Sequence, residues 1–87
     1  MPNILRKECL SMKIEPTRTF SGEEVKVIRI SANLTQLTFA AVLGVSKKTV
    51  EAWECGRNTP GGPACRLLSM IEKEPEFLGK YDFVKNE

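Results

Sequence analysis

The sequence predicts an all-α domain of four to five short helices, and two observations lead to this prediction. Apolar residues recur at the spacing of one helix side in two separate stretches. The first set is Phe39, Ala40 and Leu43, and the second is Ala64, Leu67, Leu68 and Ile71. Residues typical of helix ends stand beside the first stretch, with Thr35 before it and Gly44 after it. A chain of 87 residues with 41% hydrophobic content has the size of one small domain.

The first main helix is expected to begin at Ser21 or Gly22 and to end before Asn33. Two acidic residues, Glu23 and Glu24, fall in its first turn, where the helix dipole favours negative charge. Asn33 suits the left-handed residue that follows a helix, although glycine is commoner there.

Two pairs of apolar residues on this helix face different surroundings. Val25 and Ile28 fit the inward side of a small bundle, whereas Val27 and Ile30 do not lie on that stripe. We therefore expect something else to cover Val27 and Ile30, either the N-terminal residues or a second chain.

The central stretch predicts two helices that meet at a tight turn, over residues 36–43 and 47–54. Gly44 lies at the reversal, where a positive φ costs glycine nothing, and Ser46 suits the N-cap of the second helix. Val50 and Trp53 continue the buried side. The residues left pointing away are Lys47, Lys48, Thr49, Glu51 and Ala52. A helix-turn-helix of this kind lays its second helix in the major groove of DNA.

The last predicted helix follows a loop rich in turn-forming residues at 57–62. Pro63 fits the first position of this helix, which should end before Pro75. One further turn over 75–78 would fold Phe77 or Leu78 back on the core.

The ends of the chain complete the expected organisation. We divide it into an N-terminal arm (1–20), a helix-turn-helix domain (21–79) and a C-terminal tail (80–87). The arm contains either a short helix over 3–12 or an extended segment through 10–14. The tail is either frayed or contributes an edge strand or partner contact through Tyr81, Phe83 and Val84.

Composition disfavours several classes of function. The chain has no histidine, and its three cysteines form no CxxC pair, which argues against a metal site and a disulfide framework. We find no phosphate-binding glycine loop and no nucleophile–base pair, so we expect neither an enzyme nor a cofactor. The longest apolar run, 39–43, is far too short to span a membrane, and no signal peptide is evident. We therefore expect a cytoplasmic protein.

The charge distribution agrees with a nucleic-acid partner. The net charge of the whole chain is only +2. Residues 26–66, which hold the predicted helix-turn-helix, contain six basic and two acidic side chains, whereas the residues before them balance and those after them are acidic. Positive charge therefore gathers where phosphate contacts would be made, although chance clustering of six charges would give the same pattern.

These motifs resemble the Xre/Cro helix-turn-helix family, the fold of lambdoid phage repressors, and more narrowly the HigA-type antitoxins. The matching elements lie within residues 24–75: VIR at 27–29, LTQ at 34–36, FAxxLGVS at 39–46, TVxxWExG at 49–56, and Pro60. The stretch LLSMIEKEP at 67–75 resembles the closing helix of the antitoxin subgroup. The resemblance implies a lambda-repressor-like DNA-binding domain.

The resemblance also implies roles for individual residues. Arg29 would form an ion pair with Glu54, and Gln36 would contact a phosphate and support the recognition helix. Lys47 and Lys48 would reach guanine or phosphate, Thr49 a phosphate or a thymine methyl, and Glu51 a cytosine amine. The implied DNA-binding set is Gln36, Ser46, Lys47, Lys48, Thr49, Glu51, Ala52, Arg57 and Asn58.

We therefore expect a sequence-specific transcription regulator, a dimeric repressor of its own operon that binds a palindromic operator. Dimer contacts are expected on the last helix, where Met70 lies off the core stripe. As an antitoxin the protein would also bind a toxin of the HigB/RelE type through its N-terminal arm. The alternatives are an Xre-type regulator without a toxin and a protein-interaction adaptor that keeps only the fold.

Overall fold

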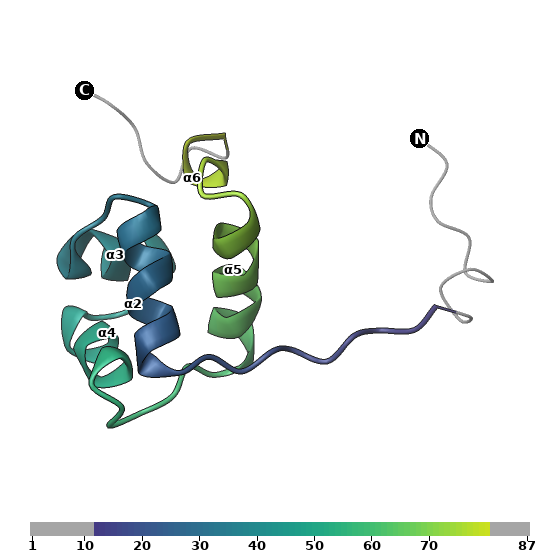
Figure 1. The fold of residues 1–87 in the computed structure, drawn as a ribbon, viewed down its shortest axis with the longest axis horizontal. Coiled ribbons are helices and arrows are strands. Elements are labelled where there is room, and N and C mark those ends of the chain that lie inside the picture. Colours follow the sequence, from purple (N-terminus) through teal and green to yellow (C-terminus); the bar gives the residue numbers. More distant parts are fainter. Residues whose placement is uncertain (1–11, 81–87) are drawn as a thin grey trace.

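The computed structural model describes residues 12–80, and within this range the chain forms five helices and no strand (Figure 1). The helices are α2 (Gly22–Ser31), α3 (Gln36–Leu43), α4 (Lys47–Glu54), α5 (Gly62–Lys73) and α6 (Phe77–Lys80). In Figure 1, α3 and α4 lie on one side of α2 and α5 lies on the other. The predicted all-α fold is confirmed.

Side-chain hydroxyls fix where three of the helices begin. The Oγ of Ser21 accepts a hydrogen bond from the amide of Glu24 at 3.1 Å, and the Glu24 carboxylate accepts one from the Ser21 amide at 2.8 Å. This reciprocal pair satisfies two amides that the first helical turn leaves free. Thr35 and Ser46 cap α3 and α4 with a single bond each, accepting from the amide three residues on at 3.1 Å. The predicted starts of α2, α3 and α4 are thereby confirmed.

Left-handed residues end two of the helices. Asn33 follows α2 with φ 61°, and Gly44 follows α3 with φ 74°. At Gly44 the reversal is closed by a hydrogen bond of 2.9 Å from the Val45 amide to the Ala40 carbonyl. Both predicted turn residues are confirmed.

The hydrophobic core lies where the four longer helices meet. Its completely buried large side chains are Val25, Phe39, Val50, Leu68 and Ile71. Trp53 is also buried, as predicted. Phe20, which we did not expect in the core, is only 3% exposed and belongs to the same cluster. The core therefore begins one residue before the cap of α2.

The C-terminal part of the fold differs from expectation by one residue. Helix α5 begins at Gly62, with Gly61 as its N-cap, so Pro63 is the second helical residue and not the first. Either position suits proline, because the first-turn amides have no partner within the helix. The helix ends at Lys73, before Pro75 as predicted, and α6 places Leu78 on the core.

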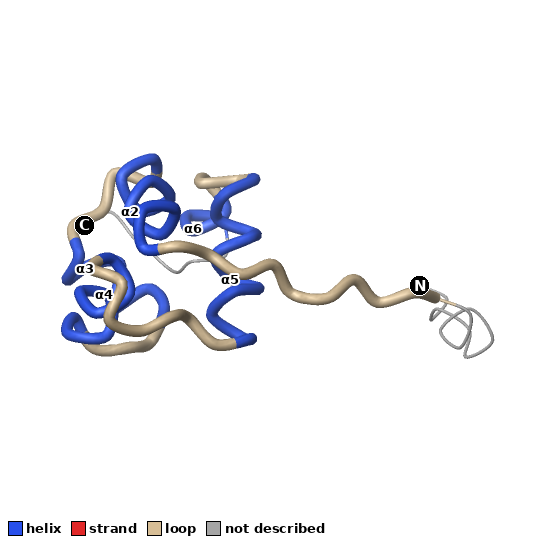
Figure 2. Tube along the Cα trace, turned by 60° about the horizontal axis from the view of Figure 1, so that its bottom comes forward, coloured by secondary structure: helices blue, strands red, loops and turns tan. Residues whose placement is uncertain are grey.

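Residues 12–19 leave the helical body as an exposed segment without regular secondary structure (Figure 2). Arg66 on α5 holds this segment by donating to the carbonyl oxygen of Glu15 at 2.7 Å. The two alternatives for the arm, a helix over 3–12 or an extended segment through 10–14, lie mostly or partly outside the described residues. The alternatives for the tail, a frayed end or a strand or partner contact through Tyr81, Phe83 and Val84, lie outside them as well. No helix in the described part of the chain has the length and hydropathy needed to cross a lipid bilayer.

Candidate nucleic-acid interface

Helix α4 lies at the edge of the body, on the side of α2 away from α5 (Figure 1). Val50 and Trp53 anchor it in the core, with exposed fractions of 0% and 5%. The three residues that open the helix, Ser46, Lys47 and Lys48, are all exposed. Their side chains can therefore reach a ligand without any rearrangement of the core.

The other outward positions of α4 are more enclosed. Thr49 and Glu51 are half-buried. The Thr49 hydroxyl shares a hydrogen bond of 2.9 Å with Ser46, and the Glu51 carboxylate lies 3.3 Å from the ammonium of Lys47. Lys48 forms no ion pair within the described residues, whereas Glu51 balances part of the Lys47 charge.

Our prediction that Ala52 points away from the protein is wrong, because this residue is buried. The amides of Arg57 and Asn58 both donate to its carbonyl oxygen, at 2.9 and 3.2 Å. The loop after α4 therefore turns back onto the last turn of the helix and satisfies one of its free carbonyl groups. Helical periodicity alone does not predict that this position is buried.

The loop after α4 presents Arg57 and Asn58 to solvent. It also carries the exposed Cys55. The backbone N–H of Arg57, followed by the Arg57 side chain, lowers the pKa of the Cys55 thiol. Arg57 and Asn58, being exposed, are accessible to a ligand that approaches this end of α4.

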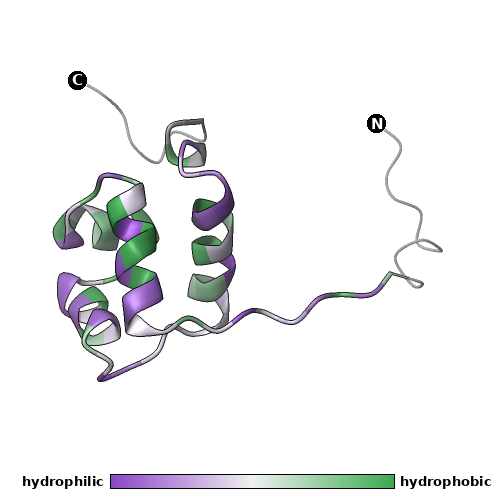
Figure 3. Cartoon of the chain, in the orientation of Figure 1, coloured by the Kyte–Doolittle hydropathy of each residue, from purple (hydrophilic) through white to green (hydrophobic). Residues whose placement is uncertain are grey.

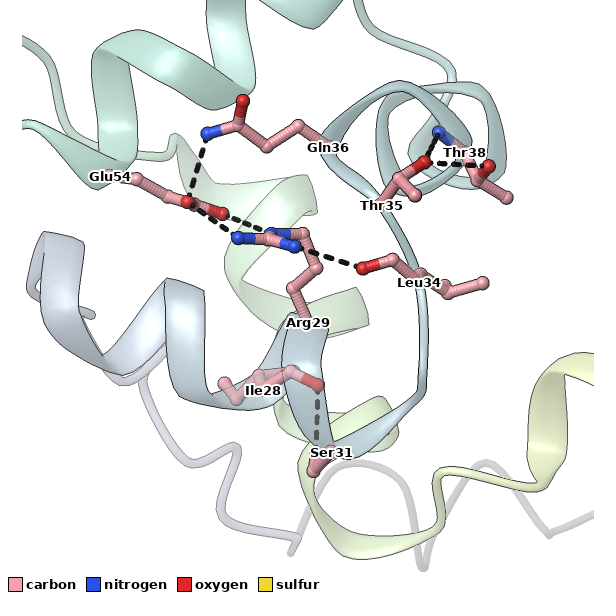
Figure 4. A network of polar contacts seen from close by, with 8 residues as sticks. All are labelled: Ile28, Arg29, Ser31, Leu34, Thr35, Gln36, Thr38 and Glu54. Atoms are coloured by element: carbon pink, nitrogen blue, oxygen red, sulfur yellow. Dashed lines mark hydrogen bonds and ion pairs between the residues drawn. The ribbon is translucent and has the colours of Figure 1, made fainter.

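A polar network joins α2, α3 and α4 behind the exposed residues (Figure 4). Arg29 donates from Nε to the Glu54 carboxylate at 2.7 Å and from Nη2 at 3.2 Å. Gln36 donates its amide to the same carboxylate at 3.0 Å. The remaining Arg29 amine donates to the carbonyl oxygen of Leu34 at 2.9 Å. The residues implied to pair, Arg29 and Glu54, are brought together, and Gln36 joins them.

Solvent has little access to the ion pair at the centre of this network. The side chains of Arg29 and Glu54 are only 13% and 7% exposed. A two-point contact between guanidinium and carboxylate fixes orientation as well as distance. Because Glu54 is the last residue of α4 and Gln36 the first of α3, the network fixes both helices of the helix-turn-helix relative to α2.

Sequence reasoning missed one further contact behind α4. A Cβ added to Gly22 would lie 2.5 Å from the carbonyl oxygen of Trp53 and 2.7 Å from that of Glu54. The first turn of α2 therefore touches the backbone at the end of α4. The only available signal was a glycine directly after a capping serine. Within residues 12–80, no three acidic or thiol side chains gather as a metal site.

Comparisons with known proteins agree with this arrangement. Residues 25–72 match the helix-turn-helix family. The chain is 40% identical over 58 residues to Antitoxin HigA-2 of Vibrio cholerae, an alignment that covers 67% of this chain and 56% of that protein. It is 36% identical over 58 residues to the uncharacterized HTH-type transcriptional regulator YiaG of Escherichia coli K12, covering 60% of that protein. The chain thus spans less than two thirds of the length of these curated relatives.

Proposed function

Because the chain belongs to the Xre/Cro-type helix-turn-helix family of DNA-binding transcription regulators, we propose that it is a repressor that binds its own operator as a homodimer. The observation that supports this most is that α4 begins with exposed basic residues while its other end is joined to α2. Lys47 and Lys48 are free to enter a groove, while the Arg29–Glu54 pair holds the helix in position.

The proposed contacts fall into two classes. Lys47, Lys48, Thr49 and Glu51 lie on α4 where base edges would be read. The proposed backbone contacts flank them and are Gln36, Ser46, Arg57 and Asn58. Gln36 uses one amide hydrogen on Glu54, and its other amide hydrogen is left to donate to a phosphate oxygen. Ala52, being buried, has no place in this set.

We propose that the operator is palindromic because one domain of this size reads only a few base pairs. Two copies related by a two-fold axis would read half-sites about one helical turn apart. Met70, on the outer side of α5, is 49% exposed and is the proposed centre of the dimer contact. An exposed thioether on a helix adapts readily to a partner surface.

A finer proposal is that the protein is the antitoxin of a toxin–antitoxin pair and acts in the cytoplasm. The similarity to Antitoxin HigA-2 supports this proposal. The partner would be a small toxin of the HigB/RelE type, bound through the N-terminal arm. The similarity to YiaG supports the second candidate, a regulator of the same fold without a toxin.

Selection of bound fragments from a random pool of duplex DNA tests the main proposal. We expect a palindromic consensus to emerge and the protein to bind it as two copies, measured by sedimentation of the complex. An adaptor that keeps only the fold would enrich no sequence. For the finer proposal, the neighbouring reading frame should encode a toxin-like protein that co-purifies with this chain, whereas the second candidate predicts no such frame.

A further inference from the structure

Helix α2 borders a groove that the proposed DNA contacts do not use. It has a volume of about 350 Å³ and is lined by Glu23, Glu24, Val27, Ile28, Ser31 and Glu72. Five of these residues follow one side of α2, and Glu72 belongs to α5. The groove thus lies between α2 and α5, while α3 and α4 lie on the other side of α2 (Figure 1).

The lining combines an apolar floor with an acidic rim. Val27 is 60% exposed, so the groove offers one branched apolar side chain directly to solvent, with the buried Ile28 beside it. Ile30, 54% exposed, extends the apolar surface of α2 beyond the groove. In Figure 3, part of the α2 ribbon has the green colour of hydrophobic residues. Glu23, Glu24 and Glu72 supply three carboxylates around the groove.

One basic side chain of the N-terminal arm, Arg18, already contacts this rim. The Arg18 guanidinium donates to the carboxylates of Glu24 and Glu72, both at 2.7 Å, and lies 4.1 Å from the centre of the Phe20 ring. One positive charge on three carboxylates leaves the rim negative, with Glu23 outside these pairs. A ligand for this groove therefore needs apolar side chains next to basic ones.

We propose that residues 1–11 of the same chain bind in the groove between α2 and α5. This segment contains Ile4 and Leu5 followed directly by Arg6 and Lys7, which matches the apolar floor and the acidic rim. It enters the described structure through residues 12–19, whose Arg18 contacts two of the lining carboxylates.

The tether favours this occupant over a separate chain. A segment joined to its site by a short linker has an effective concentration on the order of millimolar, so even weak contacts are populated. Docking there would cover Val27 and leave α4 free, so it is compatible with the proposed DNA contacts.

Paramagnetic broadening in NMR spectra tests the proposal in the full chain. A nitroxide is attached to Cys9 in a Cys55→Ser variant, where Cys65 is 3% exposed and protected from labelling. We expect the amide signals of α2 from Glu23 to Ser31 to lose intensity while those of α4 keep theirs. Equal intensities in the two helices would overturn the proposal.

Two variants and one mixture complete the test. Val27→Asp adds a charge to the groove floor and should abolish the selective loss, whereas Leu37→Asp, at a leucine 64% exposed on α3, should preserve it. A loss that survives Val27→Asp would overturn the proposal. Spin-labelled chain mixed with isotope-labelled chain that carries no nitroxide should show no selective loss; a loss in that mixture would overturn the intramolecular assignment.

Discussion

The first residue of α2, Gly22, lies against the carbonyl oxygen of Trp53, so closely that an added Cβ would be 2.5 Å from it. Trp53 is buried in the core and precedes the last residue of α4. The start of α2 therefore sets where the end of the proposed recognition helix can lie. Only a residue without a Cβ permits this approach.

Replacing Gly22 with alanine should destabilise the fold although alanine is the better helix former. We expect a loss of about 1–3 kcal/mol in the free energy of unfolding, because neither backbone can yield without displacing α2 from α4. Urea unfolding followed by circular dichroism measures it. Gly79→Ala is the matched control, since nothing lies within 4 Å of an added Cβ there. Equal stability of the two variants would contradict the tight contact.

The helix-turn-helix could be predicted from the sequence almost to the residue because its signals are local. Thr35, Gly44 and Ser46 act on the backbone within three or four residues of themselves. The outward positions of Lys47 and Lys48 follow from the same periodicity that buries Val50.

Two contacts that the sequence did not predict join distant segments. Gly22 touches the end of α4, and Arg18 reaches Glu72, 54 residues further along the chain. Ala52 is buried although helical spacing places it on the outward side of α4. Helical spacing describes one helix at a time and contains no information on what packs against it.

Removing either partner of the Arg29–Glu54 pair should be costly. For Arg29→Ala or Glu54→Ala we expect a loss on the order of 3 kcal/mol, the lower end for a buried pair, because the remaining charge keeps few partners. The double variant should lose less than the sum of the two single losses. Denaturant unfolding of all four proteins gives the coupling.

The Lys47–Glu51 pair provides the comparison for this cycle. Its side chains are 51% and 41% exposed and lie on consecutive turns of α4. Its coupling should be no more than about 0.5 kcal/mol, because solvent screens both charges. Similar coupling in the two cycles would show that burial adds nothing to the Arg29–Glu54 contact.

The stability of the fold should depend on pH through the ionisation of Glu24. The backbone N–H of Ser21, with a further contribution from Arg18, lowers the pKa of the Glu24 carboxyl. A lowered pKa in the folded state stabilises the fold above the ordinary glutamate pKa of about 4.3 and loses that effect as the pH falls through the folded pKa. The difference in the free energy of unfolding between the native chain and Glu24→Gln should therefore shrink as the pH falls from above the ordinary glutamate pKa to below the folded-state pKa. A carboxyl titration by NMR with a midpoint at or above the ordinary value would contradict the prediction.

The left-handed conformation of Asn33 should make glycine at least as stable as asparagine at this position. Its φ of 61° is a conformation that glycine adopts more easily than asparagine. We expect Asn33→Gly to be neutral or to raise the midpoint of thermal unfolding slightly, and Asn33→Ala to lower stability by about 1 kcal/mol. A gain in stability from Asn33→Ala would show that the left-handed turn after α2 is not required.

Lys48 should contribute to DNA affinity through its charge. It is exposed at the start of α4, and no ion pair within the described residues involves it, so Lys48→Ala should weaken binding to the selected operator. The slope of log affinity against log salt should become shallower by about 1, as expected when one phosphate contact is lost. Lys73→Ala removes the same charge from the exposed last turn of α5 and should leave the slope unchanged. Fluorescence anisotropy at several salt concentrations measures both variants. An equal change for Lys48 and Lys73 would mean that only net charge matters and that α4 is not the helix in the groove.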